Sequence, residues 1–472
     1  MSTISKDNLT EIINQKNDVI EDNIRDEMIL YEDSNEWAER GYIIRKSIPV
    51  ILAYLLLFAL QFISVLSLGH LGSTELAAST LASMVSFITF ISVMYGAATA
   101  LDTFCSQAYT SGNMKMVGVY LQRAIIINLL GFIPIACIWW ESEKILIFLR
   151  QSPEISAQAA LFLRYLLIGA PAYLMFVNLE RYLLAQGIMS AITYVLIICC
   201  IIDVCLNFML VWYKPLSLGF IGAPISTAIT YWLMFFFLVI YTKFINGYQA
   251  WGGWSRAAFH GWKPILTLMI PGIFMVCSEW WAIEFISFLA GYLGELSLAS
   301  QGIISTIITV IYQLPYGVSI AASNHVGNLL GASKVERAKM ASKISMQFAI
   351  IVGLFNAAIL IGFKDILGYL FTFDDDVVKC TSYVLPLVGI FAITDSINAI
   401  GYGILRGQGR QFIIAIFNTP GYFFVGIPIS ILTAFYLGYG LQGLWFGDCK
   451  RRMKEDRDKI KSMISNDPDF QA

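Results

Sequence analysis

The chain has 472 residues, of which 57% are hydrophobic and 14% are charged, with a formal net charge of −2 and a mean hydropathy of +0.67. Soluble domains are about half apolar and about a quarter charged, so this composition excludes a single water-soluble core and indicates a protein solvated by a lipid bilayer. The charge balance excludes a nucleic-acid-binding protein, and three separated histidines without a CxxC pair indicate neither a metal site nor a cofactor.

The N-terminal segment is unlike the rest of the chain. Its first forty residues hold eleven acids against four Lys or Arg, and such a composition cannot bury enough apolar surface to fold alone. We expect residues 1–41 to be a disordered acidic tail on the cytosolic side, and we find no secretory signal peptide in them.

Long apolar segments follow from Ile48 to about Leu437. Each is long enough to cross a bilayer as a helix, which takes about 20 residues. We place eleven spans, near 48–68, 76–108, 119–140, 155–185, 189–212, 222–242, 264–290, 297–326, 344–363, 379–404 and 412–437. Proline and glycine interrupt several of them, which is tolerated at membrane depth where neighbouring helices or a cavity satisfy the freed backbone groups. The sequence therefore predicts an all-α bundle around a polar cavity.

The distribution of Lys and Arg predicts the orientation of this bundle. With the N-terminus inside, fifteen Lys or Arg lie on the cytosolic side and five on the other side. Cytosolic loops carry the excess of basic residues. We therefore expect a cytosolic N-terminus.

An internal repeat divides the chain into two halves. Pro49 recurs as Pro271, "GHLG" at 69–72 recurs as "GYLG" at 291–294, and "QG" at 186–187 recurs at 408–409, all with the same spacing. Gly96 recurs as Gly317 within one position of that spacing. We predict two parallel six-helix lobes, an arrangement known from transporters that move one lobe against the other. The predicted parts are an N-lobe at 42–245, a cytosolic linker at 246–263, a C-lobe at 264–447 and a charged tail at 448–472.

The second copy departs from the first at its end. After "GFIGAP" at 219–224 the first copy continues into a sixth helix, whereas after "GLQGLWFG" at 440–447 the second copy becomes "DCKRRMKEDRDKIK". We expect a twelve-helix design whose last helix is missing here, either because the chain is truncated or mis-spliced or because the helix was lost.

Three acids lie inside predicted spans of the second half. Glu279 and Glu284 occur in "CSEWWAIEF", and Asp395 occurs in "FAITDSINAIGYGILRGQGRQ". An acid at the bilayer centre costs about 2.5–3.5 kcal/mol even on the lenient insertion scale, and burial favours the neutral carboxyl group. Such a group can exchange a proton for a cation, which makes these three acids candidate proton or cation sites. The structural alternative is a neutral carboxyl group that holds two helices together.

The positions of these acids around the helix and within the repeat bear on their role. Glu279 and Glu284 are about 140° apart around a helix, so they share a narrow face only if the helix bends, for which Pro271 is a suitable place. The first-half positions at the repeat offset are not acidic, being Leu57, Phe62 and Tyr173. The acidic chemistry is therefore confined to one lobe, which favours a function in binding.

Polar residues of the first half give weaker signals. Asp203 and Asn207 share one helix face and can line a cavity, although helix packing explains them equally well. We place Asp102 near a helix end, where a packing role is the better explanation, and we interpret Glu180 and Arg181 as a local ion pair near the cytosolic boundary.

Aromatic residues near the acids are candidates for a ligand platform. Trp280, Trp281, Tyr54 and Tyr312 can stack on a flat cation, because cation–π contacts strengthen when they are desolvated. Ordinary packing against lipid or the protein core is at least as good an explanation for each one of them.

Four separated motifs resemble the eukaryotic, fungal-type branch of the multidrug and toxic compound extrusion (MATE) family. They are "GAATALDTFCSQAY", "CSEWWAIE", "LPYGVSIAASNHVGNLLGAS" and "DSINAIGYGILRGQGRQ", and the resemblance covers about 42–447. It implies twelve helices in two lobes that form a V. It also implies antiport, in which organic cations, drugs or metabolites leave the cytosol in exchange for protons.

The resemblance extends to single residues. It assigns Glu279 and Glu284 to the acids of the seventh helix and Asp395 to the acid of the tenth helix. Thr306 stands where some animal members have a further acid early in the eighth helix, which leaves the number of proton sites open.

Other functions are less compatible with these residues. Sodium coupling stays open, whereas a flippase for lipid-linked saccharides would be expected to place cationic residues in the cavity. A membrane-embedded enzyme should show a buried histidine or paired aspartates, but we place His70, His260 and His325 in loops or at helix ends. We expect no enzymatic activity. We expect instead a monomeric multi-pass protein of the plasma membrane or vacuolar membrane.

Overall fold

The computed structural model describes residues 35–69 and 71–446, and every long regular element in this part of the chain is a helix. The helices of the first half are α2 (Glu36–Gly69), α3 (Ser73–Ser86), α4 (Ser92–Thr110), α5 (Lys115–Trp140), α6 (Ser142–Phe148), α7 (Pro153–Leu166), α8 (Ala170–Ala185), α9 (Ser190–Asn207) and α10 (Gly222–Phe244). Those of the second half are α11 (Trp262–Gly291), α12 (Glu295–Gly331), α13 (Val335–Gly362), α14 (Lys364–Leu367), α15 (Asp375–Gly407), α16 (Gln411–Pro420) and α17 (Ile427–Ile431).

Short turns of other helix types join or extend these helices. The π-helical turns η1 (Phe87–Ile91), η2 (Phe208–Trp212), η7 (Gly421–Gly426) and η8 (Leu432–Tyr436) each lie within a single candidate membrane span. The 3₁₀ turns η4 (Tyr248–Ala250) and η5 (Arg256–Phe259) lie in the segment predicted as the inter-lobe linker.

Each of the eleven predicted spans corresponds to helical residues in the described part of the chain. Ten helices are long and apolar enough to cross a membrane, and the pair α7 and α8, bent by 54°, makes an eleventh when it is counted as one span. Pro171 lies in the first turn of α8, where its missing N–H breaks no helical hydrogen bond, and a side chain at Gly169 would collide with the backbone of Ala228. The bend therefore comes from local sequence and from close packing on α10. The expected tail at 448–472 lies outside the described residues.

The border between tail and membrane helix differs from the prediction. We expected disorder up to residue 41, but α2 begins at Glu36 and Glu39 is fully buried. Glu39 contacts His325 and Arg337 of other helices. The average composition of forty residues does not reveal such contacts.

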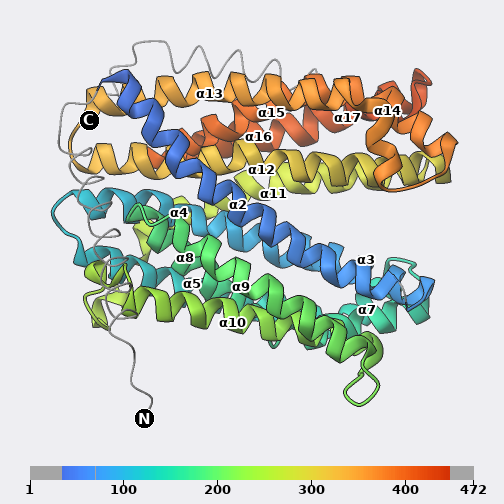
Figure 1. Cartoon of the computed structure of the whole chain (residues 1–472), viewed down its shortest axis with the longest axis horizontal. Helices are drawn as coiled ribbons and strands as arrows, with labels where there is room; N and C mark the ends of the chain where they lie inside the picture. Colours follow the sequence, from blue (N-terminus) through green and yellow to red (C-terminus); the bar gives the residue numbers. More distant parts are fainter. Residues whose placement is uncertain (1–34, 70, 447–472) are drawn as a thin grey trace, which may run out of the picture.

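The two halves of the chain form two layers, and α2 crosses between them (Figure 1). The start of α2 belongs to the second-half core, where Ile43 packs with Val318 and Ile400. The rest of α2 belongs to the first-half core, to which it contributes Val50 and Leu57. One helix is thus shared by both lobes.

The predicted repeat is visible in the way the helices cross. A side chain at Gly96 of α4 would collide with the backbone of Ile273 in α11, and one at Gly317 of α12 would collide with the backbone of Ile51 in α2. Gly96 and Gly317 are repeat equivalents, and so are Ile51 and Ile273. The two crossings are therefore copies of one another, and the two-lobe design is confirmed.

Basic residues gather at one end of the bundle, which we call the basic end. Lys115 begins α5, Lys243 lies in the last turn of α10 and Lys334 directly precedes α13. Because successive spans alternate in direction, these positions lie on the same side, where α2 begins and α4 ends (left in Figure 1).

Candidate functional site

A cavity of about 210 Å³ lies between the two lobes. Its first-half wall consists of Tyr54, Leu57, Phe58, Gln61, Phe87, Ile91, Tyr95 and Tyr173. Its second-half wall consists of Glu279, Trp280, Ile283, Glu284, Ser287, Ser305, Ile308, Thr309, Tyr312, Gln313, Tyr316, Phe391, Asp395 and Trp445. Among these lining residues the only charged type is the carboxylate, and all three carboxylates come from the second half.

The structure brings Glu279, Glu284 and Asp395 to this one cavity. The two glutamates do not need a bent helix, because a broad face of α11 lines the wall. Glu279, Trp280, Ile283, Glu284 and Ser287 follow one another at helical spacing and together cover about 140° of the helix. Asp395 reaches the cavity from α15, whose neighbour α12 supplies the tyrosines beside it.

The aromatic side of the cavity joins the two lobes. The ring of Trp280 stacks on Phe87 with centroids 4.9 Å apart and an interplanar angle of 14°, and it also contacts Tyr95 at 5.7 Å. The hydroxyl groups of Tyr95 and Tyr173 are 3.0 Å apart. The π-electron faces of such rings attract a desolvated cation, so the cavity offers aromatic surface as well as carboxylates.

Trp281 has a different environment from Trp280. Its Nε1–H donates to the carbonyl oxygen of Ile88 at 3.1 Å and to Ser92 Oγ at 3.2 Å, and 39% of its surface is exposed. It is not among the residues that line the cavity. Adjacent residues on a helix point about 100° apart, so one tryptophan of the pair lines the cavity and the other holds α11 against η1 and α4.

Thr306, Asp203 and Asn207 also lie away from the cavity wall in the described structure. Thr306 donates to the carbonyl oxygen of Gly302 in its own helix. Asp203 Oδ1 accepts hydrogen bonds from Ser226 at 3.0 Å and Thr230 at 2.7 Å, and Asn207 donates to Ser226 at 3.1 Å. These contacts bind α9 to α10 inside the first lobe. Of the predicted cavity-lining residues, Tyr54, Trp280 and Tyr312 are on the wall.

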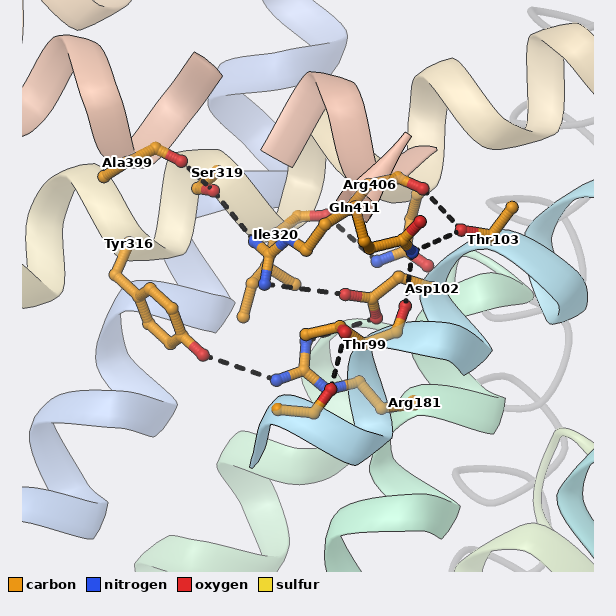
Figure 2. A network of polar contacts seen from close by, with 12 residues as sticks. Thr99, Asp102, Thr103, Arg181, Tyr316, Ser319, Ile320, Ala399, Arg406 and Gln411 are labelled. Atoms are coloured by element: carbon orange, nitrogen blue, oxygen red, sulfur yellow. Dashed lines mark hydrogen bonds and ion pairs between the residues drawn. The ribbon is translucent and has the colours of Figure 1, made fainter. Parts of the chain in front are cut away.

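A buried polar network around Asp102, called here the Asp102 network, is joined to the cavity wall at Tyr54 and Tyr316 (Figure 2). Arg181 donates to Asp102 Oδ1 at 3.3 Å and to the hydroxyl groups of Tyr54 and Tyr316 at 3.3 and 3.4 Å. Tyr54 in turn donates to Glu180 Oε1 at 2.7 Å. Since Tyr54 and Tyr316 also line the cavity, the network begins at the cavity floor.

The same network connects the two lobes. Arg406 Nη1 lies 3.7 Å from Asp102 Oδ2, and Arg406 Nη2 donates to Ser319 Oγ at 3.0 Å. Thr103 donates to the carbonyl oxygen of Arg406, and Gln411 donates to Thr103 Oγ1 at 2.9 Å. Asp102 is thereby held between an arginine of its own lobe and an arginine of the other lobe.

This network corrects two predictions. Glu180 and Arg181 do not form a local ion pair, because neighbours on a helix point in different directions and each meets a different partner. Asp102 is not near a helix end but lies in the middle of α4, fully buried and paired with Arg181 at 3.3 Å. Arg181 and Arg406 both lie in apolar stretches of the sequence. A charge in such a stretch is costly in a membrane, and this was the feature from which a buried ionic site could have been predicted.

A second ionic cluster, consisting of Glu39, His325 and Arg337 and called here the Glu39 cluster, joins α2 to the second lobe. His325 Nε2 is 2.6 Å from Glu39 Oε2, and Arg337 Nε donates to Glu39 Oε1. The ring of Tyr42 lies on His325 with centroids 4.2 Å apart. His325 was predicted at a helix end, but it lies buried inside α12. The cluster went undetected because Glu39 and its two partners come from opposite halves of the chain.

The fold and the site define a class of protein: a polytopic membrane transporter with two lobes around a shared cavity. A sequence model of the MatE family matches residues 49–209 and 271–432, so its two matches begin at the repeat-equivalent prolines Pro49 and Pro271. The chain belongs to the MatE family and is a transporter rather than an enzyme.

Three similar proteins place it within the family. An uncharacterized transporter of Schizosaccharomyces pombe is 42% identical over 88% of this chain and 78% of its own length. The multidrug and toxin extrusion protein 1 of Homo sapiens is 36% identical over 84% of this chain and 70% of its own length. The crystal structure of the eukaryotic MATE transporter AtDTX14 aligns with a TM-score of 0.83 at 28% identity, covering 91% of this chain and all of that chain. The chain is thus a eukaryotic MATE transporter.

Proposed function

We propose that the protein exports organic cations, drugs or metabolites in exchange for protons, with Glu279, Glu284 and Asp395 as the binding groups. The observation that carries the proposal is that these three carboxyl groups line one cavity, to whose wall the described residues contribute no Lys, Arg or His. A mammalian relative is named for multidrug and toxin extrusion, which agrees with the export of drugs.

Exchange follows from the competition of two ligands for the same groups. A carboxyl group removed from water favours its neutral form unless a cation lies nearby. An entering organic cation therefore displaces protons, and protons entering later displace the cation. The stack of Trp280 on Phe87 gives the flat part of such a substrate a surface beside the acids.

Two alternative functions differ in the ligands they need. Sodium coupling would use the same carboxylates together with neutral oxygen atoms, which the cavity offers at Ser287, Ser305 and Thr309. A flippase for lipid-linked saccharides needs cationic groups for the phosphates, and the cavity wall has carboxylates instead. The wall therefore favours a cation as the substrate.

The distribution of Lys and Arg supports an orientation of the protein in the membrane. We place the basic end and the N-terminus in the cytosol, because cytosolic loops carry the excess of Lys and Arg. The Asp102 network then lies between the cavity and the cytosol. We propose a monomer in the plasma membrane or vacuolar membrane.

The test is uptake of a cationic dye by proteoliposomes under an imposed pH gradient. We expect gradient-driven uptake by the unchanged protein and its loss in Glu279→Gln and Asp395→Asn. Asp203→Asn is the matched control, because Asp203 is a buried acid away from the cavity wall, and we expect it to keep uptake. Gradient-driven uptake that survives both cavity substitutions would exclude the assigned sites, and uptake driven by a sodium gradient alone would exclude proton coupling.

A further inference from the structure

A glutamine buried behind the cavity wall holds two serines of that wall. Gln301 of α12 is fully buried and is not itself among the lining residues. Its Nε2 donates to Ser305 Oγ at 3.0 Å and to Ser287 Oγ at 3.3 Å, and both serines are half-buried residues of the wall. Its Oε1 accepts a hydrogen bond from Trp445 Nε1 at 2.9 Å. One amide group therefore connects α11, α12 and the helical residues 440–446.

The orientation of this amide follows from its contact with Trp445. An indole N–H can only donate a hydrogen bond, so the carboxamide must turn its oxygen to Trp445 and its NH₂ group to the serines. Trp445 is 1% exposed, and its ring meets Phe391 of α15 edge-on with centroids 5.4 Å apart, so the indole is held in place. Both serine oxygens must then accept hydrogen bonds from Gln301.

The hydroxyl hydrogens of the two serines are left in different situations. Ser287 Oγ donates to the carbonyl oxygen of Ile283 in its own helix at 3.2 Å. In the described part of the chain, the hydroxyl group of Ser305 has hydrogen-bond contacts with Gln301 and with Ser287 Oγ only, and the second distance is 3.5 Å. An ordinary O–H···O bond is about 2.5–3.0 Å long. Ser305 thus keeps a hydrogen-bond donor for a partner inside the cavity whose wall it forms.

We propose that Ser305 donates a hydrogen bond to the substrate and that Gln301 is the positioning residue that sets the direction of this bond. The acceptor on the substrate is uncharged, such as an ether or carbonyl oxygen, because an anionic group would be repelled by the carboxylates of the same wall. The substrate class is therefore an organic cation that carries such an acceptor in addition to its charged group. This inference rests on the proposed function, to which it adds a requirement on the substrate.

The test uses two cations of equal length, N-butylpyridinium and N-(2-methoxyethyl)pyridinium. They share the same flat charged ring and differ by an ether oxygen in place of one methylene group. Isothermal titration calorimetry with the full chain in detergent gives the two dissociation constants for each variant. The readout is the Kd of the alkyl cation divided by the Kd of the ether cation, called here the ether preference. General damage to the cavity weakens both cations and leaves this ratio unchanged.

The first variants act on the donor itself. We expect Ser305→Ala to lower the ether preference about fivefold, which corresponds to the loss of one neutral hydrogen bond. Ser305→Thr keeps a hydroxyl group and should keep the ether preference. The control is Ser300→Ala, because Ser300 is a fully buried serine of the same helix that donates to the carbonyl oxygen of Val377 and is not among the lining residues. We expect this control to leave the ether preference unchanged.

The next variants act on the direction of the bond. Gln301→Leu leaves the hydroxyl group of Ser305 without a fixed orientation and should lower the ether preference. Trp445→Phe keeps an aromatic ring but removes the N–H that orients the amide. A turned amide accepts from Ser305 and withdraws its hydrogen from the cavity, so the ether preference should fall here as well.

A matched control for Gln301→Leu is Gln122→Leu. Gln122 of α5 is 2% exposed, donates to the carbonyl oxygen of Gly253 at 2.8 Å and accepts from the backbone N–H of Ser255 at 3.0 Å, but it is not among the lining residues. We expect an unchanged ether preference in this variant, although a buried amide with two hydrogen bonds is lost.

The outcomes separate this inference from the proposed function. An ether preference that is unchanged in Ser305→Ala overturns the inference, and one that falls in Ser305→Ala but not in Gln301→Leu overturns the role of Gln301. Proteoliposomes without pH-driven dye uptake, together with the expected ether preferences, would contradict proton exchange and support the hydrogen bond. If neither cation binds to the unchanged protein, both proposals are wrong. Should Gln301→Leu fail to fold, Trp445→Phe decides the role of Gln301.

Discussion

Single residues of this protein are specialised by the helix face on which they lie. Trp280 and Trp281 are adjacent, yet one stacks on Phe87 at the cavity wall and the other donates hydrogen bonds to Ile88 and Ser92 outside it. The same separation distinguishes Glu180 from Arg181. Neighbours in sequence therefore differ in role because a helix turns by about 100° per residue.

The tryptophan pair gives a direct prediction. Trp280→Ala should raise the KM for a cationic dye about 5- to 30-fold, which corresponds to the loss of about 1–2 kcal/mol of cation–π and stacking energy. Trp281→Ala should leave KM within about twofold and lower the melting temperature, because only helix contacts are lost. Initial rates of dye uptake against dye concentration check both expectations. Equal effects of the two substitutions on KM would contradict the assignment of Trp280 to the cavity.

At the scale of helices, two equivalent glycine crossings hold the lobes together. Gly96 lets α4 approach the backbone of α11, and Gly317 lets α12 approach the backbone of α2. Helices that approach this closely gain van der Waals contacts, which are a main source of helix association in a membrane. Each crossing involves the first helix of one lobe, so each first helix contacts the other half of the molecule.

Adding one methyl group at a crossing should be costly. Gly96→Ala forces the new carbon against Ile273 and the carbonyl oxygen of Gly272, and overpacking of this kind costs about 1–3 kcal/mol. The control is Gly131→Ala, since no atom of the described residues lies within 4 Å of a side chain at Gly131 and removal of a helical glycine stabilises by about 0.5–1 kcal/mol. Thermal unfolding in detergent measures both. A melting temperature of Gly96→Ala at or above that of Gly131→Ala would show that the crossing tolerates separation.

For the whole molecule, the polar contacts between lobes concentrate toward the basic end. The Asp102 network and the Glu39 cluster both join first-half to second-half helices there. The cavity with its carboxyl groups lies beyond them, along the same helices. A separation of the lobes at this end would break buried charge contacts, whose disruption is expensive.

The Glu39 cluster can be weakened without changing the cavity. Glu39→Gln removes the carboxylate that meets Arg337 and His325, so we expect faster amide hydrogen exchange at the start of α2 and in residues 320–345. Glu336→Gln is the control, because Glu336 is 87% exposed and pairs at the surface with Lys339, and such pairs contribute little. Unchanged exchange in Glu39→Gln, measured by mass spectrometry, would mean that the cluster does not hold the lobes together.

Much of the architecture was predictable from the sequence because it depends on local composition and on a long repeat. Runs of about 20 apolar residues predict membrane spans wherever they occur. Short motifs that recur at one constant spacing predicted two equivalent lobes. The three acids were identifiable as well, since a charge within an apolar run is costly and therefore conspicuous. The packing of α11 and α15 in the second lobe then brings the three acids to one cavity.

The partners of buried charges were decided only by the tertiary structure. Sequence proximity suggested that Glu180 pairs with Arg181, whereas Arg181 pairs with Asp102, which also lies near Arg406 of the other half of the chain. The sequence placed Glu39 in a disordered tail, whereas in the structure it contacts His325 of α12 and Arg337 of α13. Composition and periodicity determine which segments enter the membrane, but a contact between distant segments depends on how the helices pack, and no local pattern encodes it.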